Sequence, residues 1–242
     1  MRQSQLLQLC LLITLGFQRI LVAQTSGHQA TNHTLAHATT GCAVSLDACP
    51  AAGCGGGDPS LNVKKNRLDM PTGDAQGFTF EDFIHLETER PGPGQYTPGD
   101  RKEIEELGED TYVALAGYLI GAHPGSPETC NCKLSGEPNN DFHINLVERK
   151  TDRLTDSIVV EMTPKVRSAN PAWTLAKLQA LLKPSNPPYV RVSGYLLLDT
   201  EHISRSGGPR ITIWEIHPVT RFQVCSTVPA KCDLGTGWKD LN

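Results

Sequence analysis

Several features that would assign this chain of 242 residues to a common class are missing from its sequence. Beyond the N-terminal apolar segment, no run of residues approaches the length of a membrane-spanning helix, so we expect the mature chain to be soluble. Basic residues are not in excess, because 22 Lys and Arg stand against 26 Asp and Glu, a formal charge of −4. A nonspecific nucleic-acid binder needs a basic surface to meet phosphates. The composition therefore favours a protein or glycan partner over nucleic acid.

The common catalytic motifs are missing as well. The sequence has no G-x-S-x-G nucleophile elbow, no phosphate-binding loop, no H-E-x-x-H zinc motif and no C-x-x-C redox pair. It also shows no internal repeat. Any chemistry must therefore come from side chains that the fold brings together from separate segments.

The N-terminus has the pattern of a secretory signal peptide over residues 1–23. Arg2 supplies a basic start, residues 6–15 are mostly apolar, and Ala23 offers a small residue at a plausible cleavage point. An uncleaved N-terminal anchor is the alternative. The segment predicts a secreted or periplasmic protein.

Cysteine usage agrees with export, since disulfides form in oxidising compartments. Cys130 and Cys132 are too close to bridge each other without strain, so we expect each to reach elsewhere, for example to Cys225 or to the group between Cys42 and Cys54. An odd number of cysteines follows the signal peptide, which leaves one free or paired between chains. The disulfide candidates are Cys42, Cys49, Cys54, Cys130, Cys132, Cys225 and Cys232.

Composition divides the mature chain into three parts. Residues 24–75 are rich in Thr, Ala, Gly and His and have few large apolar side chains, so burial cannot offset the entropy of ordering them. We expect a flexible arm that contains cysteines. Residues 76–226 form the predicted β domain with short helices at its start, and residues 227–242 form a C-terminal tail.

The β domain is predicted to be mainly β, a small five-stranded OB-like barrel. One helix, capped by Asn170 and running to Leu182, lies between the third and fourth strands, which is the chain order of an OB barrel. Gly117 and Gly194 interrupt strands where a closed barrel must bend. An open α+β sheet is the alternative. The predicted strands are residues 111–120, 141–148, 157–163, 189–199 and 210–219.

Acids and histidines recur on these strands at a spacing of two. Asp141 and His143 share a face with Cα atoms roughly 6.7 Å apart, and Glu215 and His217 form a second such pair. Glu161 interrupts an apolar strand. His202 follows the fourth strand. In a closed barrel these side chains can converge: His143, His202, His217, Asp141, Glu161 and Glu215.

Two interpretations of this cluster remain open. Three neutral imidazoles suit zinc or another divalent metal, with a carboxylate as a fourth ligand or as an orienting partner. An open zinc site would activate water, with Glu161 or Glu215 as general base. The alternative is a polar network that only satisfies itself across the strands.

Four motifs carry a resemblance to a known family. They are D-x-H from Asp141, E-x-T-P from Glu161, D-x-E-H from Asp199 and W-E-I-H-P-V from Trp214. With the sequence around them, they resemble a family of exported bacterial proteins of unassigned function. The resemblance implies export and a compact β fold, and it implies no activity.

The sequence as a whole predicts an exported, disulfide-bearing β-barrel binding module that holds a divalent metal. A metal-dependent hydrolase that uses the same acids and histidines is the alternative. On the binding face we expect four aromatic side chains to stack against the ligand: Tyr112, Tyr118, Tyr195 and Trp214.

Overall fold

The computed structural model describes residues 41–89, 100–202 and 209–242. The predicted signal peptide and residues 24–40 of the predicted arm lie outside the described residues. The described strands are β1 Gln76–Phe78, β2 Tyr112–Pro124, β3 Phe142–Val147, β4 Ile158–Met162, β5 Tyr189–Leu198, β6 Trp214–Cys225 and β7 Trp238–Asp240. The α-helices are α1 Pro59–Lys65, α2 Phe80–Glu89, α3 Arg101–Glu106, α4 Pro164–Ala169, α5 Leu175–Leu181 and α6 Pro229–Asp233.

Five of these strands close into a barrel. Neighbours run in the order β2–β3–β4–β6–β5, and β5 pairs back onto β2. All of the pairs around the ring are antiparallel except β4 with β6. Numbered along the chain, the ring is 1-2-3-5-4-1, so the OB-like barrel is confirmed. β1 and β7 are additions at its edges.

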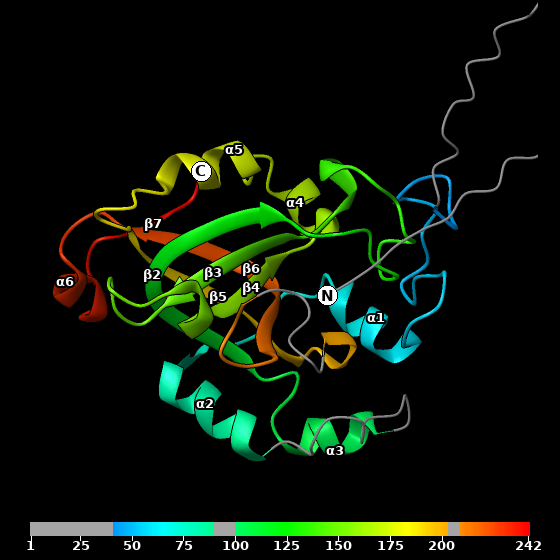
Figure 1. Cartoon of the computed structure of the whole chain (residues 1–242), viewed down its shortest axis with the longest axis horizontal. Coiled ribbons are helices and arrows are strands. Elements are labelled where there is room, and N and C mark those ends of the chain that lie inside the picture. Colours follow the sequence, from blue (N-terminus) through cyan, green and yellow to red (C-terminus); the bar gives the residue numbers. More distant parts are fainter. Residues whose placement is uncertain (1–40, 90–99, 203–208) are drawn as a thin grey trace, which may run out of the picture. The chain divides into compact units, whose positions relative to one another are not determined.

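Strand β2 closes the ring because it is long enough to pair twice. Its first half pairs with β5 and its second half with β3, and it curves around the barrel in Figure 1. Helices α5 and α2 lie on opposite sides of the barrel in that view. Gly194 stands where the pairing of β5 with β6 shifts register, and a Cβ there would lie 2.4 Å from the carbonyl oxygen of Pro218. The bend predicted at Gly194 is therefore a close approach of two backbones.

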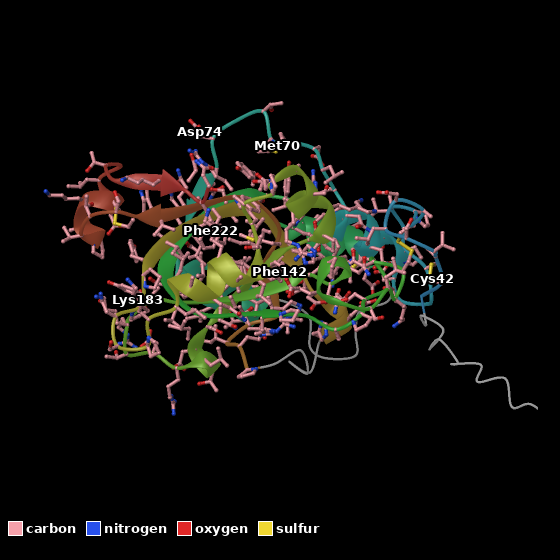
Figure 2. The ribbon with its side chains drawn as sticks, turned by 90° about the horizontal axis from the view of Figure 1, so that it is seen from above. Cys42, Met70, Asp74, Phe142, Lys183 and Phe222 are labelled. Carbon is pink, nitrogen blue, oxygen red and sulfur yellow. A yellow bond between two sulfur atoms is a disulfide. The ribbon has the colours of Figure 1, made fainter. Side chains whose placement is uncertain are left out.

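The barrel interior is filled with apolar side chains from alternate strand positions. Phe142 and Phe222 lie within it, and Trp173 and Leu178 pack against it from the segment between β4 and β5. Figure 2 shows Phe142 and Phe222 in the middle of the molecule, while Met70 and Asp74 lie on a loop that projects from it.

The helix predicted from Asn170 differs from the structure. Two short helices lie between β4 and β5 instead, with Thr163 capping α4 and Thr174 capping α5. Asn170 ends α4, because its side-chain amide donates to the carbonyl oxygen of Val166 and its own backbone leaves the helix.

The predicted flexible arm also differs over its described part. Residues 41–75 contain α1, whose Leu61 and Lys65 are fully buried, and two disulfides fix the segment. The cross-links supply the ordering that low apolar content does not. In the predicted tail, β7 pairs with β6 and Leu241 joins the core, so residues 227–242 complete the domain.

Candidate metal centre

The predicted acids and histidines lie on the outer face of the barrel. Ile144, Val160 and Ile216 are register partners across β3, β4 and β6, and all three belong to the interior core. Because successive strand residues point to opposite faces, their neighbours point outward. The outward side chains on these three strands include His143, Glu161, Glu215 and His217.

This outer face is covered rather than exposed to solvent. We call the covering part the Cys-rich lobe, residues 41–66 and 126–140. It is tied to itself by the Cys49–Cys132 disulfide, and Asn66 donates to the carbonyl oxygen of Cys130 at 2.8 Å. Figure 2 places Cys42 at the end of the molecule away from Lys183. Beneath this lobe, the four outward side chains are between 0 and 7 % exposed.

Three overlapping triads of ligand atoms form under the lobe; one is Glu128, Cys130 and Asp141, and the other two contain a histidine. In the inner triad, Asp141, Glu161 and His217 each present one ligand atom within 4.8 Å of the others. In the outer triad, Glu128, His143 and Glu161 do the same. Glu161 belongs to both, because its Oε1 lies 3.3 Å from His143 Nε2 and its Oε2 lies 3.3 Å from His217 Nδ1.

Four atoms of these triads lie within ion-pair distance of a neighbouring side chain but make no hydrogen bond. Within the described chain, no hydrogen bond reaches Asp141 Oδ2, Glu161 Oε2, His217 Nε2 or His143 Nε2, although all four are buried. Buried polar atoms are almost always hydrogen-bonded, since an unsatisfied one costs roughly 1–3 kcal/mol. Four such atoms in one place make this cluster a candidate cation site.

The other atoms of the same side chains are held in place. Asp141 Oδ1 accepts from the Asn131 amide at 2.9 Å, which leaves Oδ2 free, 3.7 Å from His217 Nε2. His217 Nδ1 lies 3.0 Å from Glu215 Oε1 and 3.3 Å from Glu161 Oε2, so Nδ1 is the nitrogen that keeps its proton when the ring is neutral, and Nε2 then carries the lone pair. A carboxylate that fixes the tautomer of a ligating histidine is a common support of metal sites.

Two buried cations, Arg210 and Lys65, pair with the carboxylates around the triads. Arg210 donates to Glu215 at 3.0 Å and to Asp199 at 3.2 Å. Lys65 donates to Glu128 at 2.9 Å. Burial alone would lower the pKa of Lys65, but Asp199 and Glu128 hold it well above its usual value, so it stays charged.

Burial and neighbouring charges shift the acids and histidines of the triads. Burial, followed by the charge of Glu128, raises the pKa of Asp141 to about 7. Burial lowers the pKa of His143, but Glu161 and Glu128 outweigh it and raise the value to about 9. Glu161 and Glu215 likewise hold the pKa of His217 well above its usual range despite burial. Without a metal, the two imidazoles are protonated at neutral pH.

The charges of the cluster balance in two ways. When all five carboxylates of the cluster are ionised, Lys65 and Arg210 leave three negative charges over. Three imidazolium ions, on His143, His202 and His217, restore neutrality, and so does one divalent cation that replaces two of those protons. The carboxylates counted are Glu128, Asp141, Glu161, Asp199 and Glu215.

The prediction that three imidazoles converge is only partly matched. His143 and His217 lie in neighbouring triads that share Glu161, while His202 binds the carboxylate of Asp199 through Nδ1. His202 is outside both triads because it follows β5, on the far side of Asp199. Glu215 orients His217 and does not face into the cluster.

Sequence reasoning missed Lys65, Glu128 and Arg210 as members of the cluster. Lys65 ends α1 and Glu128 lies outside helices and strands, so no strand spacing pointed to them. Arg210 opened the predicted strand 210–219, but in the structure it lies before β6, which begins at Trp214. The cysteine pattern gave a partial signal, because Glu128 is two residues before Cys130. Lys65 and Glu128 both belong to the Cys-rich lobe, which the Cys49–Cys132 disulfide holds together.

The disulfide candidates resolve into three bonds and one thiol. Cys42 pairs with Cys54, Cys49 with Cys132 and Cys225 with Cys232. Cys132 thus reaches the upstream cysteine group, one of the two partners expected for it. Cys130 is a buried free thiol beside Glu128 and Asp141, and burial raises its pKa well above the usual value.

The aromatic side chains do not form one stacking surface. Trp214 is fully buried, and Tyr195 is covered by the guanidinium of Arg67 at 3.6 Å from its ring. Tyr112 instead lines a groove of about 620 Å³ over β2, β5 and β6, and Tyr118 lines a separate hollow. Ser193, Thr220 and two arginines, Arg191 and Arg221, also line the groove.

Comparison with known proteins adds little. No family model matches the chain, and no curated protein matches it. A crystal structure of yeast Stn1 and Ten1 is similar over 69 % of this chain and 71 % of the other, with 14 % identity and a TM-score of 0.33. So distant a likeness supports no functional argument. The resemblance to an exported bacterial family stays a prediction.

Proposed function

We propose that this chain is an exported OB-type binding module that holds one divalent transition metal ion in its inner triad, Asp141, Glu161 and His217. The observation that carries the proposal is the set of buried, unpartnered ligand atoms on these three residues. Zinc ligands lie about 2.0–2.2 Å from the ion, so neighbouring ligand atoms in a tetrahedron are roughly 3.3–3.6 Å apart. The 3.7 Å between Asp141 Oδ2 and His217 Nε2 is close to that spacing.

The donor types favour zinc or a related transition metal over magnesium or calcium. Mg²⁺ and Ca²⁺ prefer sites made of oxygen atoms, whereas imidazole with carboxylate suits zinc, iron, copper and nickel. His217 supplies a nitrogen to the inner triad, and His143 supplies one to the outer triad.

The burial of the site favours holding a metal over hydrolysis. A metal hydrolase needs a coordination position that water and substrate can reach. The side chains of Asp141, Glu161 and His217 are 0, 2 and 0 % exposed. We therefore propose a closed metal centre and not the metal-dependent hydrolase.

Export is part of the proposal. Three disulfides form within the described chain, which is typical of proteins that mature outside the reducing cytosol. Among the described residues, no helix is long and apolar enough to cross a membrane. Together with the predicted signal peptide, these features support a secreted or periplasmic location.

A second ligand has a place on this barrel. The groove over β2, β5 and β6 presents hydroxyl groups of Tyr112, Ser193 and Thr220 beside two guanidinium groups. OB barrels bind oligosaccharides and oligonucleotides on a sheet face and its loops. The dense hydroxyl and guanidinium donors favour a glycan, so glycan-array binding of the wild type, lost on Tyr112→Ala, is the test.

The metal is tested by elemental analysis of the oxidised full chain, purified without a metal-affinity step or chelator. We expect near-stoichiometric zinc or another transition metal in the wild type and none in His143→Ala/His217→Ala. Asp141→Asn keeps the size of the side chain and should also lose the ion. His85→Ala, on exposed α2, is the matched control and should keep it.

Two results would contradict the proposal. One is a metal-free wild type that shows no thermal shift when any divalent transition metal is added. The other is unchanged metal content in Asp141→Asn and in the double variant, with circular dichroism showing that both are folded.

A further inference from the structure

A row of ligand side chains crosses the outer face of the barrel from solvent to the inner triad. His123 on β2 is the register partner of His143 on β3, and His143 is the register partner of Glu161 on β4. Glu161 in turn contacts His217 on β6 at 3.3 Å. The four residues therefore come from four adjacent strands.

Burial increases steadily along this row. His123 is exposed, and the side chains of His143, Glu161 and His217 are 9, 2 and 0 % exposed. The rings of His123 and His143 lie 5.4 Å apart between centroids. The row thus connects solvent with the inner triad through the outer triad.

The tautomer of His123 suits a metal ligand. Its Nδ1 lies 3.2 Å from the carbonyl oxygen of Pro124, which can only accept a hydrogen bond. Nδ1 therefore carries the proton, and the lone pair is on Nε2. A backbone carbonyl that accepts from the other ring nitrogen of a histidine in this way is common in metal sites.

Gly125 packs closely against His143. A Cβ on Gly125 would lie 2.6 Å from His143 Nε2, the nitrogen that faces the outer triad. Any larger residue would press against that nitrogen. Gly125 lies two residues after His123, at the solvent side of the cluster.

From this row we propose that His123 is the uptake ligand of the metal centre. It captures a divalent transition metal ion at the surface and passes it to the outer triad, from which Glu161 hands it to the inner triad. At each transfer the ion exchanges one ligand for the next, so it is never stripped of all its donors. The inference rests on the proposed metal centre. It predicts that His123 affects the rates of metal uptake and release and not the affinity or stoichiometry of the bound metal.

The test is stopped-flow zinc uptake by the metal-free, oxidised full chain, followed with a chromophoric zinc chelator as competitor. His123→Ala should slow uptake and release at least about tenfold, while zinc stoichiometry and equilibrium affinity remain close to wild type. Gly125→Ala should slow uptake too, because it crowds His143 Nε2. His85→Ala, another exposed histidine, should change neither rate.

The outcomes separate the two proposals. If the wild type takes up zinc and His123→Ala does so at the same rate, the uptake role is overturned and the metal centre stands. If His123→Ala loses affinity as much as rate, His123 is a permanent ligand and the uptake role is again overturned. A wild type that binds no zinc overturns both.

Discussion

Strands β3, β4 and β6 present two faces that differ in the polarity of their side chains. The inner face is apolar, with Ile144, Val160 and Ile216 in register. The outer face carries Glu161 and His217, equally buried but charged. Burying the apolar side chains of the inner face is favourable by itself. Burying the charged side chains of the outer face is tolerable only while each charge keeps an oppositely charged or hydrogen-bonding partner.

This contrast assigns stability mainly to the inner face and the proposed function to the outer face. Removing a group from the inner face should weaken the fold and leave the proposed metal centre intact. Removing one from the outer face should also change how the protein responds to protons and metal.

The largest effect is expected from Lys65→Met. The variant leaves Glu128 without its buried lysine, while Asp199 keeps Arg210, and breaking a buried pair costs about 3–5 kcal/mol. The same loss of positive charge should tighten metal binding. Urea unfolding of the metal-free protein and zinc titration measure the two effects, which should have opposite signs.

Lys102→Met is the matched control for this substitution. Lys102 is an exposed lysine paired at 4.0 Å with Glu106, so its loss should cost less than about 1 kcal/mol. Equal costs for the two lysines would show that the buried network contributes no more than a surface pair.

On the inner face, Ile144→Ala should destabilise the protein by about 2–5 kcal/mol, because the deletion leaves a cavity in a closed core. Chemical denaturation measures the loss. Metal content should stay at the wild-type stoichiometry, since Ile144 points away from the triads. Loss of metal in a folded Ile144→Ala would break the separation of the two faces.

The response to pH should belong to the outer face alone. Folding raises the pKa of Asp141 from 3.8 to about 7 and that of His143 from 6.5 to about 9, so both bind protons more tightly in the folded state. The metal-free protein should therefore lose stability as pH rises, through Asp141 between pH 3.8 and 7 and through His143 between pH 6.5 and 9. The His143 contribution is roughly 3 kcal/mol.

Metal should reverse this trend, because the ion replaces protons on the same atoms and binds more tightly as they leave. Melting temperatures at pH 5, 7 and 9, with and without zinc, measure both slopes. A metal-free melting temperature that climbs from pH 6.5 to 9 would contradict the assignment of charges in the cluster.

The smallest effect is expected at a surface pair away from both faces. Arg221 and Asp240 join β6 to β7 at 2.8 Å, with side chains 54 and 47 % exposed. Arg221→Ala should cost less than about 1 kcal/mol in urea unfolding and leave zinc binding unchanged.

The sequence predicted the barrel because alternation and glycine placement are local signals. Gly194, for example, marked a bend that the backbone of β6 requires. The sequence also indicated Asp141, His143, Glu161 and His217, because a period of two puts them on one face. It did not predict that His202 stays apart, since no spacing rule describes the turn after β5.

The cover over the site was not predictable in the same way. Residues 41–66 have few large apolar side chains, and their order comes from the disulfides of Cys49 and Cys42, whose partners no local pattern fixes. Glu128 and Lys65 meet across 63 positions of the chain. Long-range cross-links of this kind are read from a fold and not from a sequence window.

The alternation of apolar and charged residues also constrains how the barrel assembles. If β4 slipped by one residue against β3, Glu161 would enter the apolar interior and Val160 would face the cations and histidines. An unpaired carboxylate in such a core costs several kcal/mol, so the slipped pairing is strongly disfavoured. The same side chains that form the proposed metal centre thus also favour the correct strand register during folding, because a shifted alignment of β3, β4 and β6 would bury them in the apolar interior.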